Sequence, residues 1–212
     1  RYRISSIEPD LLTDEIIAFV ASSKRFCPHF HIPLQSGSDS VLRLMRRHYD
    51  TALFADKVAT IKRYMPHAFI GVDVIAGMRG ETDERFEESY RFIESLDISQ
   101  LHAFTYSERP NTRALTIEPV VPVHVRHERC NRLIQLSEQK LHDFYARYVG
   151  SVRQVLFEHP VKGHPLLGFT VNYIRVEMTA VPEAGNPVRT VVLGESNEQG
   201  DALTARFMEE SI

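Results

Sequence analysis

The first 115 residues alternate short apolar runs with segments of helical periodicity, and the alternation occurs four times. The apolar runs are Tyr2–Ser6, Phe30–Leu34, Phe69–Ile75 and Leu101–Thr105. Strands that alternate with helices pair in parallel, so this pattern predicts an α/β fold built on a barrel or an open sheet. Because a closed barrel of eight such units takes about 250 residues, four units predict only a partial (β/α) parallel barrel.

The chain changes character after Gly150, where short alternating runs are separated by Gly and Pro. The runs are Val152–Glu158, Phe169–Met178, Val188–Leu193 and one near Ala205. Four or five short strands in about 60 residues predict a small antiparallel β-barrel of the oligonucleotide-binding kind. Pro119 and Pro122 introduce a long helix to about Tyr148, which closes the first domain. We therefore expect one domain over residues 1–147 and a second over residues 148–212.

The net charge of −3 is unevenly distributed. Residues 1–147 hold 20 basic and 20 acidic side chains, whereas residues 148–212 hold 5 and 8. Neither part is a broad basic surface that would bind nucleic acid by counterion release, so any such contact is expected to be local. Two cysteines, no apolar leader and no apolar run of about 18 residues argue against a secreted disulfide-rich fold and a membrane span. We expect a cytoplasmic protein, and a chain that opens at Arg1 is expected to be a fragment of a longer one.

Polar residues follow all four predicted strands, at the edge where parallel barrels carry their active sites. They are Ser5, Ser6 and Glu8, then Gln35, Ser36 and Ser38, then Asp73, Gly77, Gly80 and Glu81, and finally Tyr106, Ser107 and Arg109. The alternative interpretation is that these residues are ordinary loop residues and helix caps. The turn from Gly77 to Thr82 could hold an anion, but it lacks the Lys-Ser/Thr ending of a nucleotide-binding P-loop.

A histidine pair raises a second hypothesis, a metal-dependent hydrolase. His29 and His31 lie two residues apart on a predicted strand, so both side chains share one face with Cys27. Asp73 and His102, on later strands, could complete a metal site. Against this, the pair lies at the beginning of its predicted strand, away from the expected active-site edge, so we expect no metal site.

The polar strand ends resemble one known family in order and spacing, the radical S-adenosylmethionine methylthiotransferases. The matching segments are Arg3–Pro9, His31–Ser38, Met45–Tyr49, Asp73–Gly77, Gly80–Thr82, His102–Phe104 and Tyr106–Arg109. In the second domain, Val155–Glu158 and Gly168–Tyr173 look like the family's RNA-binding TRAM domain. The resemblance implies the last four βα units of a radical SAM barrel followed by a TRAM-like barrel.

Within the family, the chain looks most like the branch that acts on N6-threonylcarbamoyladenosine beside the tRNA anticodon, with the isopentenyladenosine branch second. Family members use S-adenosylmethionine and two [4Fe-4S] clusters to add a methylthio group to C2 of the adenine. The resemblance implies that Gln35, Ser36 and Arg47 face the methionine part of S-adenosylmethionine. It also implies that the cavity where cofactor and adenine meet is lined by Ser6, Glu8, Asp73 and Gly77.

Two further expectations concern basic residues. Basic and aromatic groups cluster in the second domain, so RNA contacts are expected from Arg153, Asn172, Tyr173 and Arg175. In the first domain, Arg43 and Arg47 would share one face of a continuous helix while Arg46 lies about 100° away. These three arginines are therefore not expected to reach one ligand.

The sequence also departs from the family. The Cys-x3-Cys-x2-Cys motif that holds the radical cluster is absent, and Cys27 and Cys130 cannot replace six ligands. We expect that this chain ligates no cluster and is inactive alone. The turn at Gly77 reads Gly-Met-Arg-Gly-Glu-Thr where the family has Gly-Phe-Pro-Gly-Glu-Thr, and Asn111 replaces a common Gly. The alternative to an enzyme is a non-catalytic RNA-binding module.

Overall fold

The structure is a computed structural model that describes residues 1–161, 163–179 and 187–207. It forms two compact units, Arg1–Lys140 and Leu141–Ile212. The division falls inside the last helix, and the domain boundary placed after residue 147 stays a prediction. In the described part of the chain, no helix combines the length and the apolar character that crossing a membrane requires.

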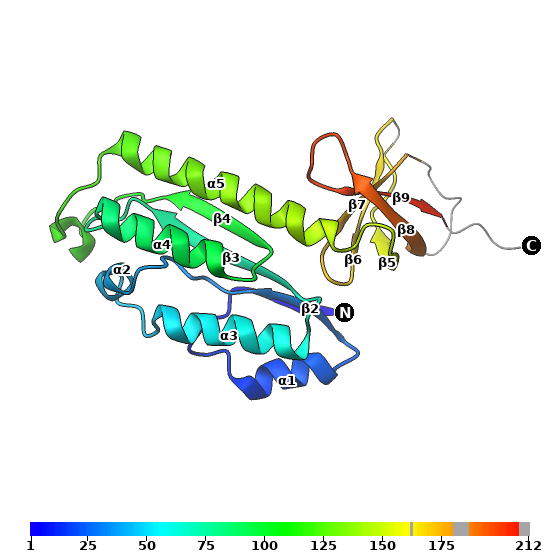
Figure 1. The fold of residues 1–212 in the computed structure, drawn as a ribbon, viewed down its shortest axis with the longest axis horizontal. Coiled ribbons are helices and arrows are strands. Elements are labelled where there is room, and N and C mark those ends of the chain that lie inside the picture. The colour runs from blue at the N-terminus through cyan, green and yellow to red at the C-terminus, as the bar shows by residue number, and fades with distance from the viewer. Residues whose placement is uncertain (162, 180–186, 208–212) are drawn as a thin grey trace, which may run out of the picture. The chain divides into compact units, whose positions relative to one another are not determined.

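The first unit contains a four-stranded parallel sheet with strand order β1-β2-β3-β4 (Figure 1). The strands are β1 (Tyr2–Ile4), β2 (Phe26–His31), β3 (Phe69–Ala76) and β4 (Gln100–Thr105). The predicted parallel α/β sheet is confirmed, but the second strand was placed too late. Its ladder ends at His31, and Ile32 and Leu34 still donate to carbonyls of β3 while Pro33 has no N–H to pair.

The helices of this unit are α1 (Asp14–Ser22), α2 (Asp39–Leu44), α3 (Thr51–Tyr64), α4 (Asp83–Ser95) and α5 (Val123–Ala146), with a 3₁₀ turn η1 (Arg113–Thr116). Three of these helices, α1, α3 and α4, begin at residues whose side chains cap them. Thr13 and Thr82 accept hydrogen bonds from the N–H groups of Ile16 and Arg85, as predicted. Asp50 caps α3 by accepting from the Leu53 N–H at 2.8 Å.

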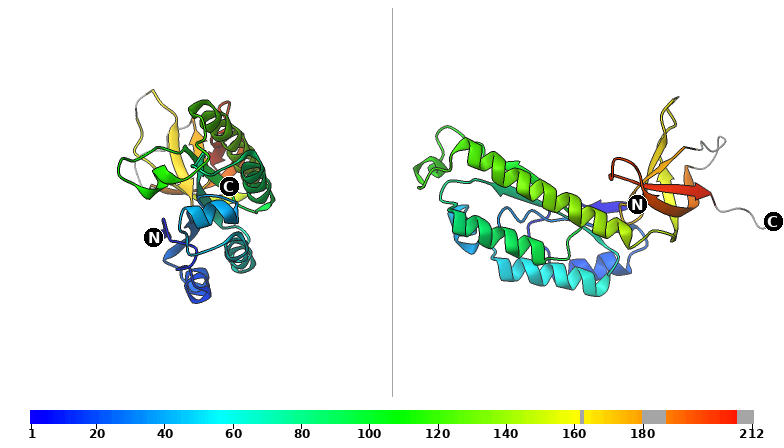
Figure 2. Two further views of the ribbon diagram at one scale, coloured as in Figure 1. Left: turned by 90° about the vertical axis from the view of Figure 1, so that its left-hand side faces the viewer. Right: turned by 45° about the horizontal axis from the view of Figure 1, so that its top comes forward.

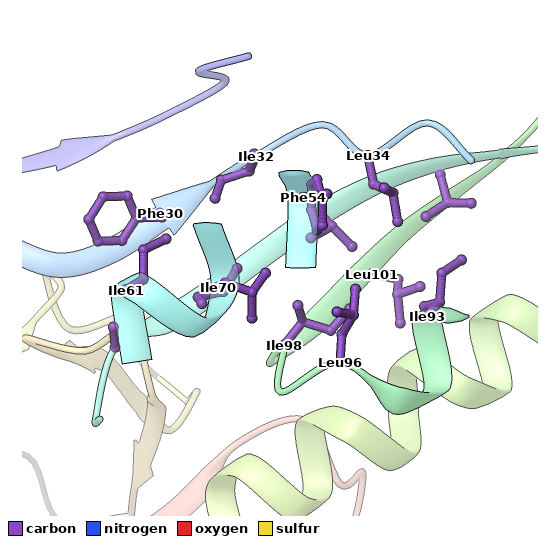
Figure 3. Close-up of a cluster of buried hydrophobic side chains, with 14 of the residues drawn as sticks. Phe30, Ile32, Leu34, Phe54, Ile61, Ile70, Ile93, Leu96, Ile98 and Leu101 are labelled. Atoms are coloured by element: carbon purple, nitrogen blue, oxygen red, sulfur yellow. The ribbon is translucent and has the colours of Figure 1, made fainter. Parts of the chain in front are cut away.

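One apolar core lies between a single face of the sheet and the helices. Figure 3 shows side chains from β2 to β4 meeting those from α3 and α4, and the core includes Phe30, Ile32, Leu34, Phe54, Ile61, Ile70, Ile93 and Leu101. Helix α1 and residues 130–136 of α5 pack on the same core. In the views of Figure 2, α1, α3 and α4 accordingly lie on one side of the sheet. The side chains on the opposite face of the sheet do not belong to this core.

Successive side chains of a strand point to opposite faces of the sheet, which determines the residues on the face opposite the core. Because Phe30 and Ile32 point into the core, His29 and His31 point away from it. Asp73 and His102 are paired across β3 and β4 and share the face of His31. The histidine pair lies at the end of β2, next to the carboxyl edge, and the earlier placement at the strand's beginning was wrong.

The second unit is a closed barrel of five strands with order β5-β6-β7-β9-β8. The strands are β5 (Val152–Phe157), β6 (Leu166–Thr170), β7 (Arg175–Met178), β8 (Val188–Ser196) and β9 (Leu203–Phe207). The expectation of an antiparallel barrel needs correction, because β7 and β9 pair in parallel. A closed ring with an odd number of strands cannot be antiparallel at every pair. The run Phe169–Met178 also spans two strands, since the chain turns at Tyr173 with φ of 66°.

Candidate functional site

An open cavity of about 650 Å³ lies at the carboxyl ends of β3 and β4. Three segments enclose it: the end of α2, the end of β3 with its turn, and the loop that carries η1. Its lining residues are Arg43, Leu44, Met45, Arg46, Arg47, Ile75, Met78, Tyr106, Arg113, Ala114, Thr116 and Ile117. The cavity therefore has four arginines and no acidic residue in its lining, with an apolar remainder.

The four arginines differ in their partners. Arg47 donates to Glu8 Oε1 at 3.0 Å, and its own Nε is buried without a hydrogen-bond partner. Arg43 donates to the hydroxyl of Ser40 at 3.2 Å. In the part of the chain that the structure describes, the guanidinium groups of Arg46 and Arg113 have no acidic partner. The cavity is therefore a region of uncompensated positive charge.

The end of α2 explains how adjacent arginines reach one cavity. Arg46 and Arg47 donate their backbone N–H groups to the carbonyls of Arg43 and Leu42, which is the Schellman arrangement. Arg46 occupies the left-handed position of that arrangement, with φ of 58°. The premise of a continuous helix through Arg43, Arg46 and Arg47 was wrong, because α2 ends at Leu44 and the chain turns there, so that all three arginines line one cavity. That they do not reach one ligand stays a prediction.

Arg79 and the buried Arg126 hold the loop that carries η1. Arg79 donates to the Leu115 carbonyl at 2.6 Å and to Glu108 at 2.9 Å. Arg126 donates to the same carboxylate at 3.0 Å and to the Tyr106 carbonyl at 3.2 Å. Arg79 and Arg126 together lower the pKa of Glu108. The position of Arg113 at the cavity is thus fixed by contacts on both sides of the loop.

Three of the predicted site residues share a backbone feature. Ser6, Gln35 and Gly77, which follow β1, β2 and β3, have φ of 54°, 68° and 79°. Left-handed backbone at Ser and Gln is uncommon and is found at active sites where the surrounding structure imposes it. Asn111 is also left-handed, with φ of 63°, and asparagine tolerates this conformation where the family has Gly.

Ser6, His31 and Asp73 form a chain of contacts on the open face of the sheet. Ser6 Oγ lies 3.4 Å from His31 Nδ1, and His31 Nε2 lies 2.9 Å from Asp73 Oδ1. The His102 ring packs edge-on against His31 at 5.4 Å. Sequence reasoning singled out Ser6 and Asp73 for a cofactor cavity, and the structure brings them together through His31.

The metal hypothesis finds no support in this geometry. Among the described residues, no group of three or more His, Cys, Asp or Glu side chains is arranged to hold a metal ion. The His29 ring stacks on Phe69, with ring centroids 5.4 Å apart. Burial, followed by the nearby charge of Arg3, lowers the pKa of His29 to about 4.

Other predicted residues have structural partners. Ser36 is buried and accepts from the Ser38 N–H at 3.2 Å. The Gly77 N–H donates to Glu81 at 2.8 Å, and a Cβ at Gly77 would lie 2.3 Å from Arg126 Cγ. Glu81 is itself buried against Arg129. Of the seven residues predicted to meet the cofactor, Arg47 lines the cavity described here.

In the barrel, the four predicted RNA-contacting residues occupy different environments. The Arg153 guanidinium lies over the Tyr148 ring at 5.0 Å, and Arg175 pairs with Asp201. Asn172 is buried and accepts from the Thr170 hydroxyl at 2.8 Å. Tyr173 stacks on Phe169 with ring centroids 4.8 Å apart.

Sequence reasoning did not connect Arg113 or Tyr106 with Arg43, Arg46 and Arg47. Arg113 lies far along the chain from the other arginines, just after the segment matched to the family. The sequence did contain one signal: Arg43, Arg46 and Arg47 lie within a span of five residues that follows the polar end of a predicted strand. Only the folded loop places Arg113 beside them.

The chain's two cysteines do not form a cluster site. Cys27 lies on β2 and Cys130 on α5, both side chains are buried, and burial raises the pKa of the Cys130 thiol. Iron–sulfur clusters are held by several thiolates gathered around one point. The residues of this chain therefore do not fit a [4Fe-4S] cluster.

Comparison with known proteins finds a matching family model and similar proteins of known name. Residues 1–93 match the Radical SAM superfamily. The chain is 36% identical to the threonylcarbamoyladenosine tRNA methylthiotransferase MtaB of Bacillus subtilis, over 100% of this chain and 48% of that protein. It is 34% identical to MtaB of Aquifex aeolicus, over 90% of this chain and 45% of that protein.

The dimethylallyl branch is almost as similar. A tRNA-2-methylthio-N(6)-dimethylallyladenosine synthase of Clostridium botulinum is 34% identical over 82% of this chain and 40% of that protein. The resemblance to radical SAM tRNA methylthiotransferases is thereby confirmed, and the chain spans about half the length of these relatives. Coproporphyrinogen III oxidase (HemN) of Escherichia coli, a radical SAM enzyme, shares the fold with a TM-score of 0.52 at 13% identity. That match covers 93% of this chain and 49% of HemN.

Proposed function

We propose that this chain is part of a tRNA methylthiotransferase that acts on N6-threonylcarbamoyladenosine next to the anticodon. The observation that carries the proposal is the 36% identity to MtaB across the whole chain, together with the Radical SAM match over residues 1–93. The dimethylallyladenosine branch is the second candidate, because its relatives are 34% identical. A cytoplasmic location is part of the same proposal.

The carboxyl edge of the sheet supports a site for S-adenosylmethionine. When bound, S-adenosylmethionine supplies the methyl group and the adenosyl group of radical chemistry. Arg47 would hold its methionine carboxylate, since the buried Nε without a partner and the neighbouring open cavity fit an anion. Gln35 and Ser36 would adjoin that part of the cofactor. The space beside the adenine would be lined by Ser6, Glu8, Asp73 and Gly77.

The second unit supports a role in RNA contact as a TRAM-like barrel. Five-stranded closed barrels with a Greek-key path are a common oligonucleotide-binding architecture. The stacked rings of Phe169 and Tyr173 are a platform of the kind on which bases stack. Arg153, Asn172 and Arg175 would complete the contact around it, with the tRNA anticodon region as partner.

The proposal is tested on the whole protein from which this chain comes, purified without oxygen and loaded with iron and sulfide. With S-adenosylmethionine, reductant and tRNA that contains N6-threonylcarbamoyladenosine, we expect a mass gain of one methylthio group on that nucleoside. Digestion of the tRNA and mass spectrometry measure it. Modification of dimethylallyladenosine instead would establish the second candidate, and hydrolysis of the RNA or no change in any nucleoside would contradict both.

A second prediction concerns Arg47. Arg47→Lys in the whole protein is expected to weaken S-adenosylmethionine binding about tenfold, because lysine cannot make the two parallel hydrogen bonds of a guanidinium. Equilibrium dialysis with labelled S-adenosylmethionine measures the change. Arg91→Lys, at an exposed position of α4 outside the cavity, is the matched control. Equal affinities of the two variants would remove Arg47 from the cofactor site.

A further inference from the structure

The arginine-lined cavity has more positive charge than one carboxylate needs. Arg47 already has Glu8 as a partner, whereas Arg43, Arg46 and Arg113 face the cavity without any acidic partner among the described residues. We propose that Arg46 and Arg113, with Arg43 at their side, bind the carboxylate of the N6-threonylcarbamoyl group. This inference rests on the proposed function and names the feature of the substrate that the site recognises.

The charge of the cavity favours an anionic group over an apolar one. The threonylcarbamoyl substituent ends in a carboxylate, whereas the dimethylallyl substituent is a hydrocarbon. A dimethylallyl group in this cavity would remove water from guanidinium groups that have no acidic partner, which is unfavourable. A carboxylate in the same place would receive charge-assisted hydrogen bonds from those groups. The same residues therefore attract one substrate and disfavour the other.

The backbone at Arg46 gives an independent reason. Arg46 occupies the left-handed position that ends α2, where glycine is the usual residue because it has no Cβ to strain the backbone. A side chain at this position has an energetic cost that must be offset by something else. Among the described residues no acidic side chain pairs with the Arg46 guanidinium, and Arg46 lines the cavity, so an anion bound there would offset this cost.

The size and remaining lining of the cavity fit the rest of the substituent. A volume of about 650 Å³ lies within the usual range for small-molecule sites of about 300–1,000 Å³. Leu44, Ile75, Met78 and Ile117 supply apolar surface for the threonine methyl group. Tyr106 also lines the cavity, and the guanidinium of Arg126 lies over its ring at 5.3 Å.

The test measures binding of the whole protein from which this chain comes to three anticodon stem-loops. They are identical except for the adenosine beside the anticodon, which is N6-threonylcarbamoyladenosine, N6-dimethylallyladenosine or unmodified. The parent protein is expected to bind the threonylcarbamoyl RNA about tenfold more tightly than the other two. Arg46→Gly and Arg113→Gln should each remove most of that advantage, so that affinity for the threonylcarbamoyl RNA falls several times more than affinity for the unmodified RNA.

Arg46→Gly should change RNA binding without destabilising the fold, because glycine adopts the left-handed backbone at this position without strain. The thermal midpoint of this variant should therefore not fall. Arg91→Gln, outside the cavity, is the matched control and should keep the full preference. An equal loss for all three RNAs would mean that the arginines contact the phosphate backbone, and it would overturn the proposal.

Two further outcomes are decisive. If saturating S-adenosylmethionine abolishes the preference, the cavity belongs to the cofactor carboxylate and the proposal fails while the proposed function stands. Equal binding of the threonylcarbamoyl and dimethylallyl RNAs by the parent protein has the same consequence. If none of the three RNAs binds, the proposed function is contradicted and this inference with it.

Discussion

Arg129→Met is expected to lower the free energy of unfolding by about 3–5 kcal/mol, because it leaves the buried Glu81 carboxylate without its partner. Glu81 and Arg129 side chains are 2% and 7% exposed, and Arg129 Nη1 lies 2.7 Å from Glu81 Oε1. The same guanidinium donates to the Glu81 carbonyl at 3.0 Å, so α5 is tied to the start of α4. Burial raises the pKa of Glu81 despite the opposing effects of Gly77 and Arg129.

Urea denaturation followed by circular dichroism measures the loss, and a surface pair provides the control. Arg132 and Glu87 form a similar pair at 2.5 Å, but both side chains are 40% exposed. Arg132→Met should therefore cost less than about 1 kcal/mol. Adding Glu81→Gln to Arg129→Met should recover part of the loss, since a neutral amide replaces the unpaired charge. Equal costs at Arg129 and Arg132 would show that burial of the pair does not determine its importance.

Acidification from pH 7 to pH 5 is expected to destabilise the first unit by about 2 kcal/mol through His29 alone. Burial lowers the pKa of His29 to about 4, from 6.5 in the unfolded chain. The unfolded state therefore binds a proton at a higher pH than the folded state does. The stability that neutral His29 provides is fully present above pH 6.5 and is lost as the pH falls from 6.5 towards 4.

The measurement compares urea denaturation at the two pH values in the parent and in His29→Gln. The variant removes the titrating ring, so its stability should change less between pH 7 and pH 5 by about 2 kcal/mol. His124→Gln, at an exposed position of α5, should keep the pH dependence of the parent. If the parent and His29→Gln lose the same stability on acidification, other groups are responsible.

Local patterns along the chain were sufficient to predict the architecture. Alternation of apolar strands with capped helices depends on contacts within a few residues, which is why the strands at Phe69 and Leu101 and the caps at Thr13 and Thr82 were placed correctly. The five-strand closure of the barrel depends on pairing between distant strands. Its parallel β7–β9 pair follows from that closure rather than from any local pattern.

The candidate site shows the same division. The polar residues after each strand, including Ser6, Gln35 and Asp73, could be found from the sequence because they follow recognisable apolar runs. The cavity lined by Arg46 and Arg113 could not, because its charge is assembled from the end of one helix and from a loop far along the chain. Helical periodicity even indicated that the neighbouring arginines diverge, and only the turn at the end of α2 brings them together. Long-range packing decides which charges meet, and it is not encoded in the spacing of residues along one segment.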